Sequence, residues 1–471
     1  MSIPSEAAST TSRTSPTTPA PDSATSAAPT GALPRRIGLW SAIAVCIGTT
    51  IGSGIFRSPA GVADKIPGPL PMLGVWAVGG LFALCGALTL AEVASAIPRT
   101  GGFYAFLREG WGRLYAFLFG WAQLSVVRAA ALGAISITFA EYFLRVLGFD
   151  PSVAPYDQYA RYVAAGAIVL TGTLNVVGVR WGTAVTNITT IAKYGGLVFI
   201  VVIALAIGLP RTGGNFTPWI PEGSFVLSSA GLALVSALWA YDGWADVSYV
   251  AGEVKDPQRN LPRALIGGTV AVIIIYALAN LAYLAVLPVD EIRTSRLVAA
   301  DVAERVIGRP GVIIVSVTVM LSTFGTLSAV LLTSPRVLFA MADDGMLFRQ
   351  VAKVHPRFKT PYVAITLVAT LGFVFVLLRS FEQLADAFVI AMLPFYAGGV
   401  AVVYRLRRRP GYVPAFRTPG YPVVPAIFLL SVVYLLVNAL QDASSRVATA
   451  QTLGFVAAGI PIFYIFLARK R

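Results

Sequence analysis

Long runs of hydrophobic residues, separated by short polar segments, make up most of this chain. A transmembrane helix needs ~20 consecutive, mostly apolar residues, and runs of that length recur from residue 37 to the end of the sequence. This pattern predicts an all-α polytopic membrane protein with about twelve transmembrane helices. The predicted spans are residues 37–59, 70–97, 113–147, 159–178, 185–209, 226–250, 263–287, 311–340, 362–379, 383–404, 422–440 and 449–468.

Two segments depart from this pattern. Residues 1–35 are rich in Ser, Thr, Ala and Pro and lack an apolar run, so we expect a disordered tail without a signal peptide. Residues 288–310 lie between two spans, and their helix-like part, residues 295–307, is expected to form a short amphipathic helix outside the membrane. Residues 36–471 are the predicted transmembrane domain.

Two predicted spans contain glycine and polar residues at their centres. The first span reads Ile-Gly-Ser-Gly-Ile-Phe over residues 51–56, and the sixth reads Trp-Ala-Tyr-Asp-Gly-Trp over residues 239–244. Glycine weakens a helix and allows backbone N–H and C=O groups to face something other than lipid, as a binding site requires. The alternative is that each glycine only permits tight packing between helices.

The spacing of these two interruptions predicts the architecture. Five spans separate them, which is typical of two inverted five-helix repeats with a binding site between them near the midplane of the membrane. The repeats would cover residues 36–210 and 225–405, and two additional helices would cover residues 420–470.

Charge distribution predicts the orientation in the membrane. Only 12% of the residues are charged and 56% are hydrophobic, yet the net charge is +14. Most of the lysines and arginines outside the spans fall on the side of the two termini, so the positive-inside rule places both termini in the cytoplasm of a cell-membrane protein. This distribution accounts for the positive charge without nucleic-acid binding.

Several ionisable residues lie inside predicted spans, among them Arg57 and Arg128, and an unpaired charge is unfavourable there. Asp242 and Lys193 are the two that bear on a binding site. Asp242 could pair with a cationic substrate side chain, bond to local groups, or act as a protonated acid. Lys193 lies in the fifth span, where it needs hydrogen-bond acceptors unless its side chain extends to the surface.

Catalytic chemistry is not predicted. We find no metal site, no cofactor-binding glycine loop and no catalytic triad in the sequence, so an enzyme is not expected. A continuous polar pore, as in an ion channel, is not predicted either. Cys46 and Cys85 both lie in apolar segments, where cysteine packs as a small hydrophobe.

Several spaced motifs resemble the amino acid-polyamine-organocation transporter superfamily. Two of them, in the third and sixth spans, are most similar to the L-type amino acid transporter family and its bacterial relatives. In that family proline usually follows the third-span arginine, whereas Ala129 follows Arg128 here. The matching segments are residues 51–56, 92–104, 120–142, 239–244, 252–265 and 336–347.

An amino acid fits the opened helices chemically, and the resemblance implies the same roles. Backbone N–H groups at the start of a helix can hold the substrate carboxylate, while carbonyls at a helix end can accept from its ammonium group. The resemblance also implies that Trp239 closes over the substrate as a gate. The expected substrate-binding residues are Thr50, Ile51, Gly52, Ser53, Gly54, Trp239, Ala240, Asp242 and Gly243.

The resemblance further implies a coupling site without sodium. A lysine in the fifth span of related transporters occupies the sodium site of sodium-coupled relatives, so Lys193 would link carbonyls of the first span to hydroxyls of the eighth. Ser322, Thr326 and Ser328 are the candidate hydroxyls. Exchange and proton coupling both remain open.

The sequence therefore predicts a sodium-independent transporter that moves neutral L-amino acids by alternating access. Transport of cationic amino acids or polyamines is an alternative that Asp242 supports, and a non-transporting amino acid sensor is another. Eukaryotic members of the L-type family pair with a heavy chain through an external cysteine. Neither cysteine here is placed for that bond, so no disulfide-linked heavy chain is expected.

Overall fold

The computed structural model describes residues 35–97, 102–177, 180–343, 345–347 and 349–466. Within these ranges the chain is helical, apart from one isolated β-bridge between Ile37 and Val254. The predicted tail falls outside the described residues except for its last position. The first half comprises α1 Leu39–Thr50, α2 Gly54–Lys65, α3 Pro69–Ala96, α4 Gly102–Trp111, α5 Arg113–Ala122, the π-helical η1 Gln123–Val127, α6 Arg128–Val146, α7 Tyr156–Val177, α8 Arg180–Ile203, the π-helical η2 Ala204–Gly208 and α9 Leu209–Thr212.

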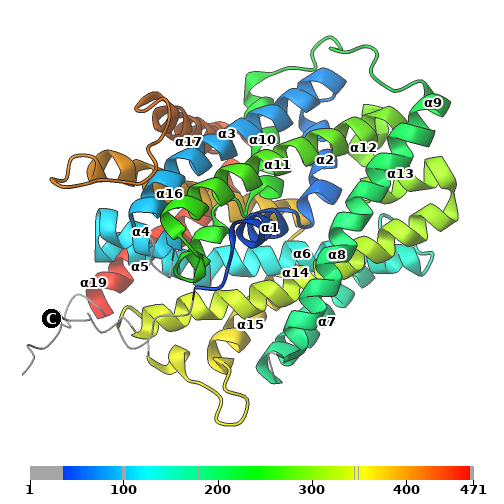
Figure 1. Ribbon diagram of the computed structural model, residues 1–471. Coiled ribbons are helices and arrows are strands. Elements are labelled where there is room, and N and C mark those ends of the chain that lie inside the picture. The colour runs from blue at the N-terminus through cyan, green and yellow to red at the C-terminus, as the bar shows by residue number, and fades with distance from the viewer. Residues whose placement is uncertain (1–34, 98–101, 178–179, 344, 348, 467–471) are drawn as a thin grey trace, which may run out of the picture. The chain divides into compact units, whose positions relative to one another are not determined.

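The second half continues the same bundle (Figure 1). It comprises α10 Leu227–Tyr241, the 3₁₀-helical η3 Asp246–Glu253, α11 Pro257–Val286, α12 Val289–Thr294, α13 Val298–Ile307, α14 Arg309–Asp343, the 3₁₀-helical η4 Arg349–Ala352, α15 Tyr362–Leu378, α16 Phe381–Leu406, α17 Val423–Gln441, α18 Arg446–Ala457 and α19 Gly459–Phe466.

The structure agrees with a polytopic membrane protein. Nine helical segments of the described chain are long and apolar enough to cross a membrane, and α1 with α2 makes a tenth if this bent pair is one span. α10 and α15 cover the predicted sixth and ninth spans, but with 15 and 17 residues they are shorter than that criterion requires. The all-helical fold is confirmed, whereas the count of twelve spans stays a prediction.

Local sequence signals explain where several helices begin. Pro69 and Pro257 stand at the first positions of α3 and α11. Proline costs no helical hydrogen bond there, because the N–H groups of the first turn have no partner within the helix. α16 begins with a capping box, in which the Ser380 hydroxyl accepts from the Gln383 backbone N–H and the Gln383 side chain accepts from the Ser380 N–H.

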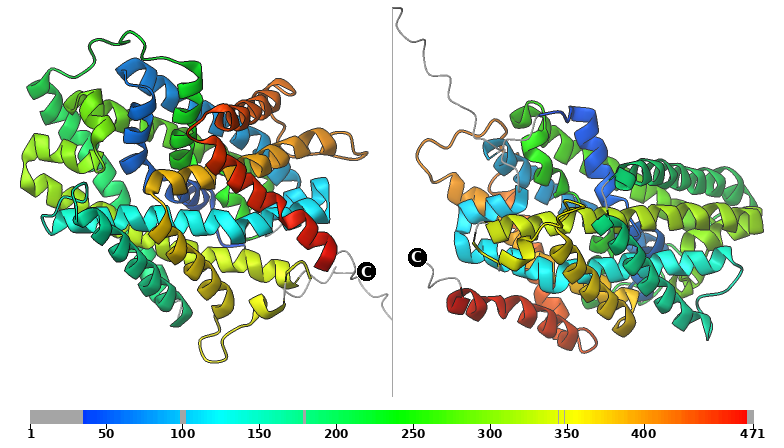
Figure 2. Two further views of the ribbon diagram at one scale, coloured as in Figure 1. Left: turned by 180° about the vertical axis from the view of Figure 1, so that it is seen from behind. Right: turned by 90° about the horizontal axis from the view of Figure 1, so that it is seen from below.

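The helices pack so that the two predicted interruptions lie inside the bundle. α1 packs on α11, α2 packs on α10 and α12, and α14 packs along both α6 and α8. Figure 1 shows α1 in the middle of the bundle, with α4, α5 and α19 at one end and α9, α12 and α13 at the other. Figure 2 shows α18 and α19 along the outside.

The segment between α11 and α14 contains two short helices where the sequence predicted one. α13 covers most of the expected amphipathic helix, and its buried face consists of Val and Ala residues. The preceding α12 was not predicted, because six residues are too few to show a helical period. α12 lies against α2, which follows the interruption of the first predicted span.

One buried ion pair joins α3 to the segment after α16. The Glu92 side chain is fully buried and accepts two hydrogen bonds from the Arg407 guanidinium, at 2.8 and 2.7 Å. The backbone N–H of Thr418 also donates to Glu92, at 2.7 Å, and Arg407 stacks 3.8 Å from the Tyr421 ring centroid. This bidentate pair fixes the α16–α17 segment on α3.

We expect Glu92→Gln to destabilise the protein by about 2–3 kcal/mol, because it leaves Arg407 without its charged partner in a mostly buried position. Glu109→Gln is the matched control, since Glu109 pairs with Arg409 at 2.6 Å but both side chains are 42% exposed. That variant should lose less than about 1 kcal/mol. Thermal unfolding of the purified proteins in detergent measures both, and equal losses would contradict the interpretation.

Candidate functional site

The first predicted span breaks at residues 51–53. α1 ends at Thr50 and α2 begins at Gly54, with the two helix axes bent by 46°. Ile51 has an extended backbone (φ −73°, ψ 102°), which ends the α1 hydrogen-bond ladder. The last carbonyls of α1 and the first N–H groups of α2 therefore lack helical partners and meet in the middle of the bundle.

The sixth predicted span breaks in the same way at residues 242–245. α10 ends at Tyr241, Asp242 is extended (φ −60°, ψ 151°), and the chain resumes as η3 at Asp246. Gly243 has φ +104°, a backbone conformation that side chains other than glycine rarely adopt. The Asp-Gly pair thus supplies both the helix end and the turn.

The two breaks contact each other directly. A Cβ atom on Gly54 would lie 2.4 Å from the Cα of Ala240, and one on Gly243 would lie 2.7 Å from the backbone carbon of Thr49. Each break therefore carries a glycine that admits the backbone of the other. Gly54 and Gly243 thus permit tight packing between helices, which was the alternative interpretation of these glycines. A Cβ on Gly52, by contrast, would meet no atom within 4 Å.

Tyr276 of α11 connects the two helix ends. Its hydroxyl lies 3.0 Å from the carbonyl oxygen of Thr50 and 2.9 Å from that of Ala240, and it is fully buried. One hydroxyl proton is shared between two carbonyls that the helix breaks leave free. This role could not be predicted from the sequence, because Tyr276 lies in an otherwise apolar run.

Asp242 has a local partner. The Tyr396 hydroxyl of α16 donates to its carboxylate oxygen Oδ1. Beside this pair, between α3, α10 and α16, lies a cavity of about 10 Å³, which is close to the room of one water molecule. An amino acid does not fit a space of this size, so binding there requires the surrounding helices to move apart.

Trp239 lies in the last turn of α10, among aromatic rings of α16. Its ring contacts Phe388 edge-to-face at a centroid distance of 5.0 Å and Phe381 at 6.1 Å. Its indole N–H has no hydrogen-bond partner among the described protein atoms. The ring is 8% exposed, so it forms part of the closed wall of the site.

A buried arginine stands one turn after the first break. Arg57 of α2 forms ion pairs with Glu382 of α16 at 2.8 Å and with Glu141 of α6 at 3.3 Å, and it lies 5.1 Å from the Phe381 ring centroid. The sequence showed Arg57 inside a span but gave no indication of its partners. These contacts join α2, α6 and α16 just beyond Trp239.

Lys193 contacts the first break from the opposite side. Its side chain is 6% exposed, and its Nζ atom donates to the carbonyl oxygen of Gly48 in the last turn of α1, at 3.0 Å. The neighbouring Tyr194 hydroxyl donates to the carbonyl of Ala44 at 3.4 Å. The structure thus brings Lys193 to the first span and buries it rather than extending it to the surface.

The three candidate hydroxyls of α14 differ in their surroundings. Ser322 is buried and its hydroxyl has no hydrogen-bond partner among the described protein atoms, whereas Ser328 accepts from Asn175 at 3.3 Å and Thr326 bonds to the carbonyl of Ser322 at 2.9 Å. None of the hydrogen bonds described here joins Lys193 to any of the three.

The packing register favours Ser322 among these candidates. Gly196 of α8 faces Thr318 of α14 so closely that a Cβ on Gly196 would lie 2.1 Å from the threonine methyl. The fifth and eighth predicted spans run in opposite directions. One turn back along α8, at Lys193, therefore corresponds to one turn forward along α14, at Ser322.

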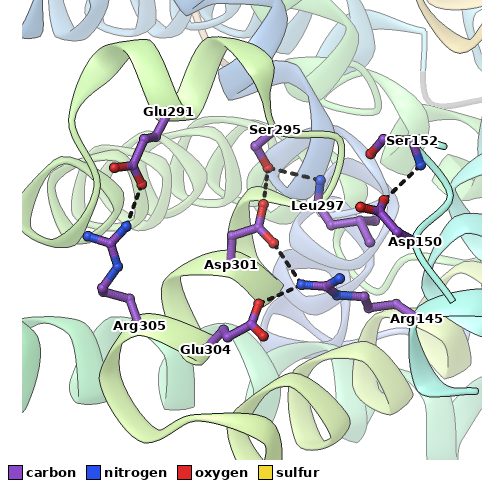
Figure 3. A network of polar contacts seen from close by, with 9 residues as sticks. All are labelled: Arg145, Asp150, Ser152, Glu291, Ser295, Leu297, Asp301, Glu304 and Arg305. Atoms are coloured by element: carbon purple, nitrogen blue, oxygen red, sulfur yellow. Dashed lines mark hydrogen bonds and ion pairs between the residues drawn. The ribbon is translucent and has the colours of Figure 1, made fainter. Parts of the chain in front are cut away.

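A second polar cluster lies away from the two breaks (Figure 3). It lines a cavity of about 620 Å³ between the end of α6, the following loop and helices α12 and α13. Arg145 pairs with Asp301 at 3.4 Å and with Glu304 at 2.5 Å, and Arg305 pairs with Glu291 at 2.7 Å. These ion pairs hold the two short helices to one another and to α6.

Comparison with known proteins agrees with this geometry. The family described as amino acid permease matches residues 37–466, almost the whole described chain. The chain belongs to the amino acid permease family. The permeases are transporters and not enzymes, as the sequence predicted.

Curated relatives narrow the family. The serine/threonine exchanger SteT of Bacillus subtilis (strain 168) is 31% identical, over 93% of this permease and 98% of that protein. The b(0,+)-type amino acid transporter 1 of Homo sapiens is 30% identical, over 94% and 90%. The large neutral amino acids transporter small subunit 2 of Homo sapiens is 30% identical, over 92% and 81%.

The name of the third relative, a small subunit, bears on whether this permease has a partner protein. A protein called a small subunit is named as part of an assembly, which conflicts with our expectation that this permease has no disulfide-linked heavy chain. In this permease both cysteines, Cys46 and Cys85, are buried in α1 and α3.

We expect Gly243→Ala to lower the stability of this permease by about 2 kcal/mol or more, because alanine is strained at φ +104° and its methyl group would overlap Thr49. Gly52→Ala is the matched control, since open space surrounds that position. The free energy of unfolding of this control should lie within about 0.5 kcal/mol of the wild-type value. Thermal unfolding in detergent distinguishes them; a Gly243→Ala protein as stable as the control would show that the contact between the breaks is not tight.

Proposed function

We propose that this permease exchanges neutral L-amino acids across the membrane without sodium, by alternating access around the two helix breaks. The observation that carries the proposal is the meeting of both breaks at Gly54–Ala240 and Gly243–Thr49, with the Lys193 amine bonded to the end of α1. Backbone N–H donors and C=O acceptors without helical partners are concentrated at this point.

The backbone groups fit the two ends of an amino acid. The first N–H groups of α2, at Ser53 and Gly54, carry partial positive charge and suit a carboxylate, and the open space at Gly52 allows it to approach. The carbonyls of Thr50 and Ala240, now shared by the Tyr276 hydroxyl, suit an ammonium group. The substrate would replace part of this hydrogen bonding as the breaks separate.

Sodium independence rests on Lys193. Its Nζ atom already supplies a donor to the Gly48 carbonyl, and Ser322 offers a buried hydroxyl at the same level of α14. A cation that is part of the protein would fill the place of a coupling ion, so substrate movement need not be tied to a sodium gradient. This matches the role that the family resemblance implies.

Opening toward the outside would separate α16 from α2. The Arg57–Glu382 ion pair crosses this interface, and the Trp239–Phe388 contact crosses the neighbouring interface between α10 and α16. On the other side of the breaks, three backbone hydrogen bonds of 2.8–2.9 Å join residues 36 and 37 to residues 253 and 255. α1 and η3 are therefore expected to move together as the inner halves of the two broken spans.

Two observations favour neutral substrates. Tyr396 donates to the Asp242 carboxylate, so this acid has a partner without a cationic substrate. Two relatives are named for serine and threonine or for large neutral amino acids. The name of SteT describes an exchanger, which favours exchange over proton coupling.

We further propose that both termini are cytoplasmic, since Arg108 of α4 and Arg113 of α5 lie close together in the chain and Arg405 of α16 lies 5.5 Å from the Trp111 ring between them. Figure 1 shows α4, α5 and α19 at the same end of the bundle. Any partner subunit would associate without a disulfide bond, because Cys46 and Cys85 are both buried within the bundle.

Exchange predicts a specific flux pattern in liposomes. Uptake of labelled serine or leucine should be at least ~10-fold faster into proteoliposomes preloaded with unlabelled neutral amino acids than into empty ones, because the loaded carrier returns and the empty one does not. Replacing sodium with choline should leave this rate unchanged. Equal uptake into empty vesicles driven by a pH gradient would contradict exchange, and binding without flux would indicate a sensor.

We expect Lys193→Ala to reduce exchange at least ~10-fold while the protein still inserts and purifies, because the Gly48 carbonyl loses its donor and the coupling position loses its charge. Tyr194→Phe is the matched control, since it removes a neighbouring hydrogen bond to α1 but no charge. Undiminished exchange by purified Lys193→Ala would overturn the role given to this lysine.

A further inference from the structure

The cytoplasmic end of α16 and the turn between α4 and α5 together form an exposed cluster of arginines. Arg405, Arg408 and Arg409 are exposed at the end of α16, and Arg108 and Arg113 are exposed on either side of the turn. The two segments are nearly 300 residues apart in the chain. We call these five arginines with Trp111 the arginine patch.

Specific contacts bring the two segments together. The Trp111 indole N–H donates to the Gly398 carbonyl of α16 at 2.9 Å, and Arg405 lies 5.5 Å from the centroid of the Trp111 ring. Arg409 bonds to both the side chain and the carbonyl of Glu109, at 2.6 and 2.7 Å. The patch is therefore a fixed part of the fold.

Most of the positive charge of the patch is not neutralised by the protein. Arg409 takes up the one acidic side chain of the turn, Glu109. Among the described residues, no carboxylate lies within ion-pair distance of Arg405, Arg408 or Arg113. Arg407, by contrast, turns inward to Glu92 and so belongs to the core of the fold.

The patch lies at the level of lipid headgroups. Two separate spanning segments end there, since one begins at Arg113 and another, Phe381–Leu406, ends beside Arg405. Trp111 is 40% exposed at the same level, where amphipathic aromatic rings concentrate in membrane proteins. A guanidinium group can hold a phosphate through two hydrogen bonds.

We propose that the arginine patch binds the phosphate headgroup of an anionic phospholipid. The phosphate lies between the α4–α5 turn and the end of α16, with Arg405 and Arg408 as its main partners, and the lipid chains run along the adjacent spans. A soluble phosphate would find the same donors, but the position of the patch beside the membrane selects the lipid.

Native mass spectrometry of the purified full-length protein tests this, with phosphatidylglycerol and phosphatidylcholine of the same acyl chains as probes. The double variant Arg405→Gln/Arg408→Gln should bind phosphatidylglycerol about 25-fold more weakly than the wild type, since each arginine near an anionic headgroup contributes about fivefold. Phosphatidylcholine binding should not change. The single variant Arg408→Gln, whose side chain makes no ion pair, should show about a fivefold loss and tests the proposal if the double variant does not fold.

Lys353→Gln/Lys359→Gln is the matched control, because it removes two exposed charges from the loop before α15. It should bind phosphatidylglycerol like the wild type. Unchanged binding by both arginine variants, or an equal loss in the lysine control, would overturn the proposal. Full displacement of the lipid by glycerol 3-phosphate would also overturn it, since that result indicates a site for soluble anions.

Discussion

The close approach of the two broken spans is the constraint on which the rest of the structure depends. Neither Gly54 nor Gly243 could carry a side chain, because the backbone of the other span occupies that space. The contact places the ends of α1 and α10 together, so that one tyrosine hydroxyl, from Tyr276, reaches the last carbonyls of both. A small-residue contact of this kind provides packing, and it also gathers free backbone polar groups in one place.

Ionisable side chains around this contact bind the broken spans to the neighbouring helices. Lys193 bonds to α1, before the first break, and Arg57 joins α2, after that break, to α6 and α16. Asp242, at the second break, is bonded to Tyr396 of α16. A charged side chain inside a membrane protein needs a partner. Here each partner lies on another helix than the charged residue itself. The same pairs that stabilise the closed arrangement must therefore separate or exchange partners when the site opens.

Much of this arrangement could be predicted from the sequence, because it depends on local composition. Apolar runs mark the helices, and glycine within a run marks a break. A lysine within a run indicates that its amine has hydrogen-bond acceptors inside the bundle. The two breaks were predicted at residues 51–56 and 239–244, and the structure ends α1 at Thr50 and α10 at Tyr241. The family match shows that the motifs had been assigned to the correct superfamily.

The remaining features depend on contacts between distant segments, which leave no trace in a single sequence. Tyr276 resembles any other residue of an apolar helix until α11 is placed beside both breaks. The partners of Arg57 lie more than 80 residues away, at Glu141 and Glu382. Gly52 and Gly54 were both expected to bind the substrate, and in the structure Gly54 packs against Ala240 while open space surrounds Gly52. Sequence spacing cannot distinguish these two uses of glycine.

An experimental structure of this permease with a transported amino acid bound would test the central claim most directly. Our account predicts the substrate carboxylate on the backbone N–H groups of residues 52–54 and its ammonium group on the carbonyls near Thr50 and Ala240, with the Gly54–Ala240 contact widened. A substrate bound away from both breaks, with the Gly54–Ala240 and Gly243–Thr49 contacts unchanged, would contradict it.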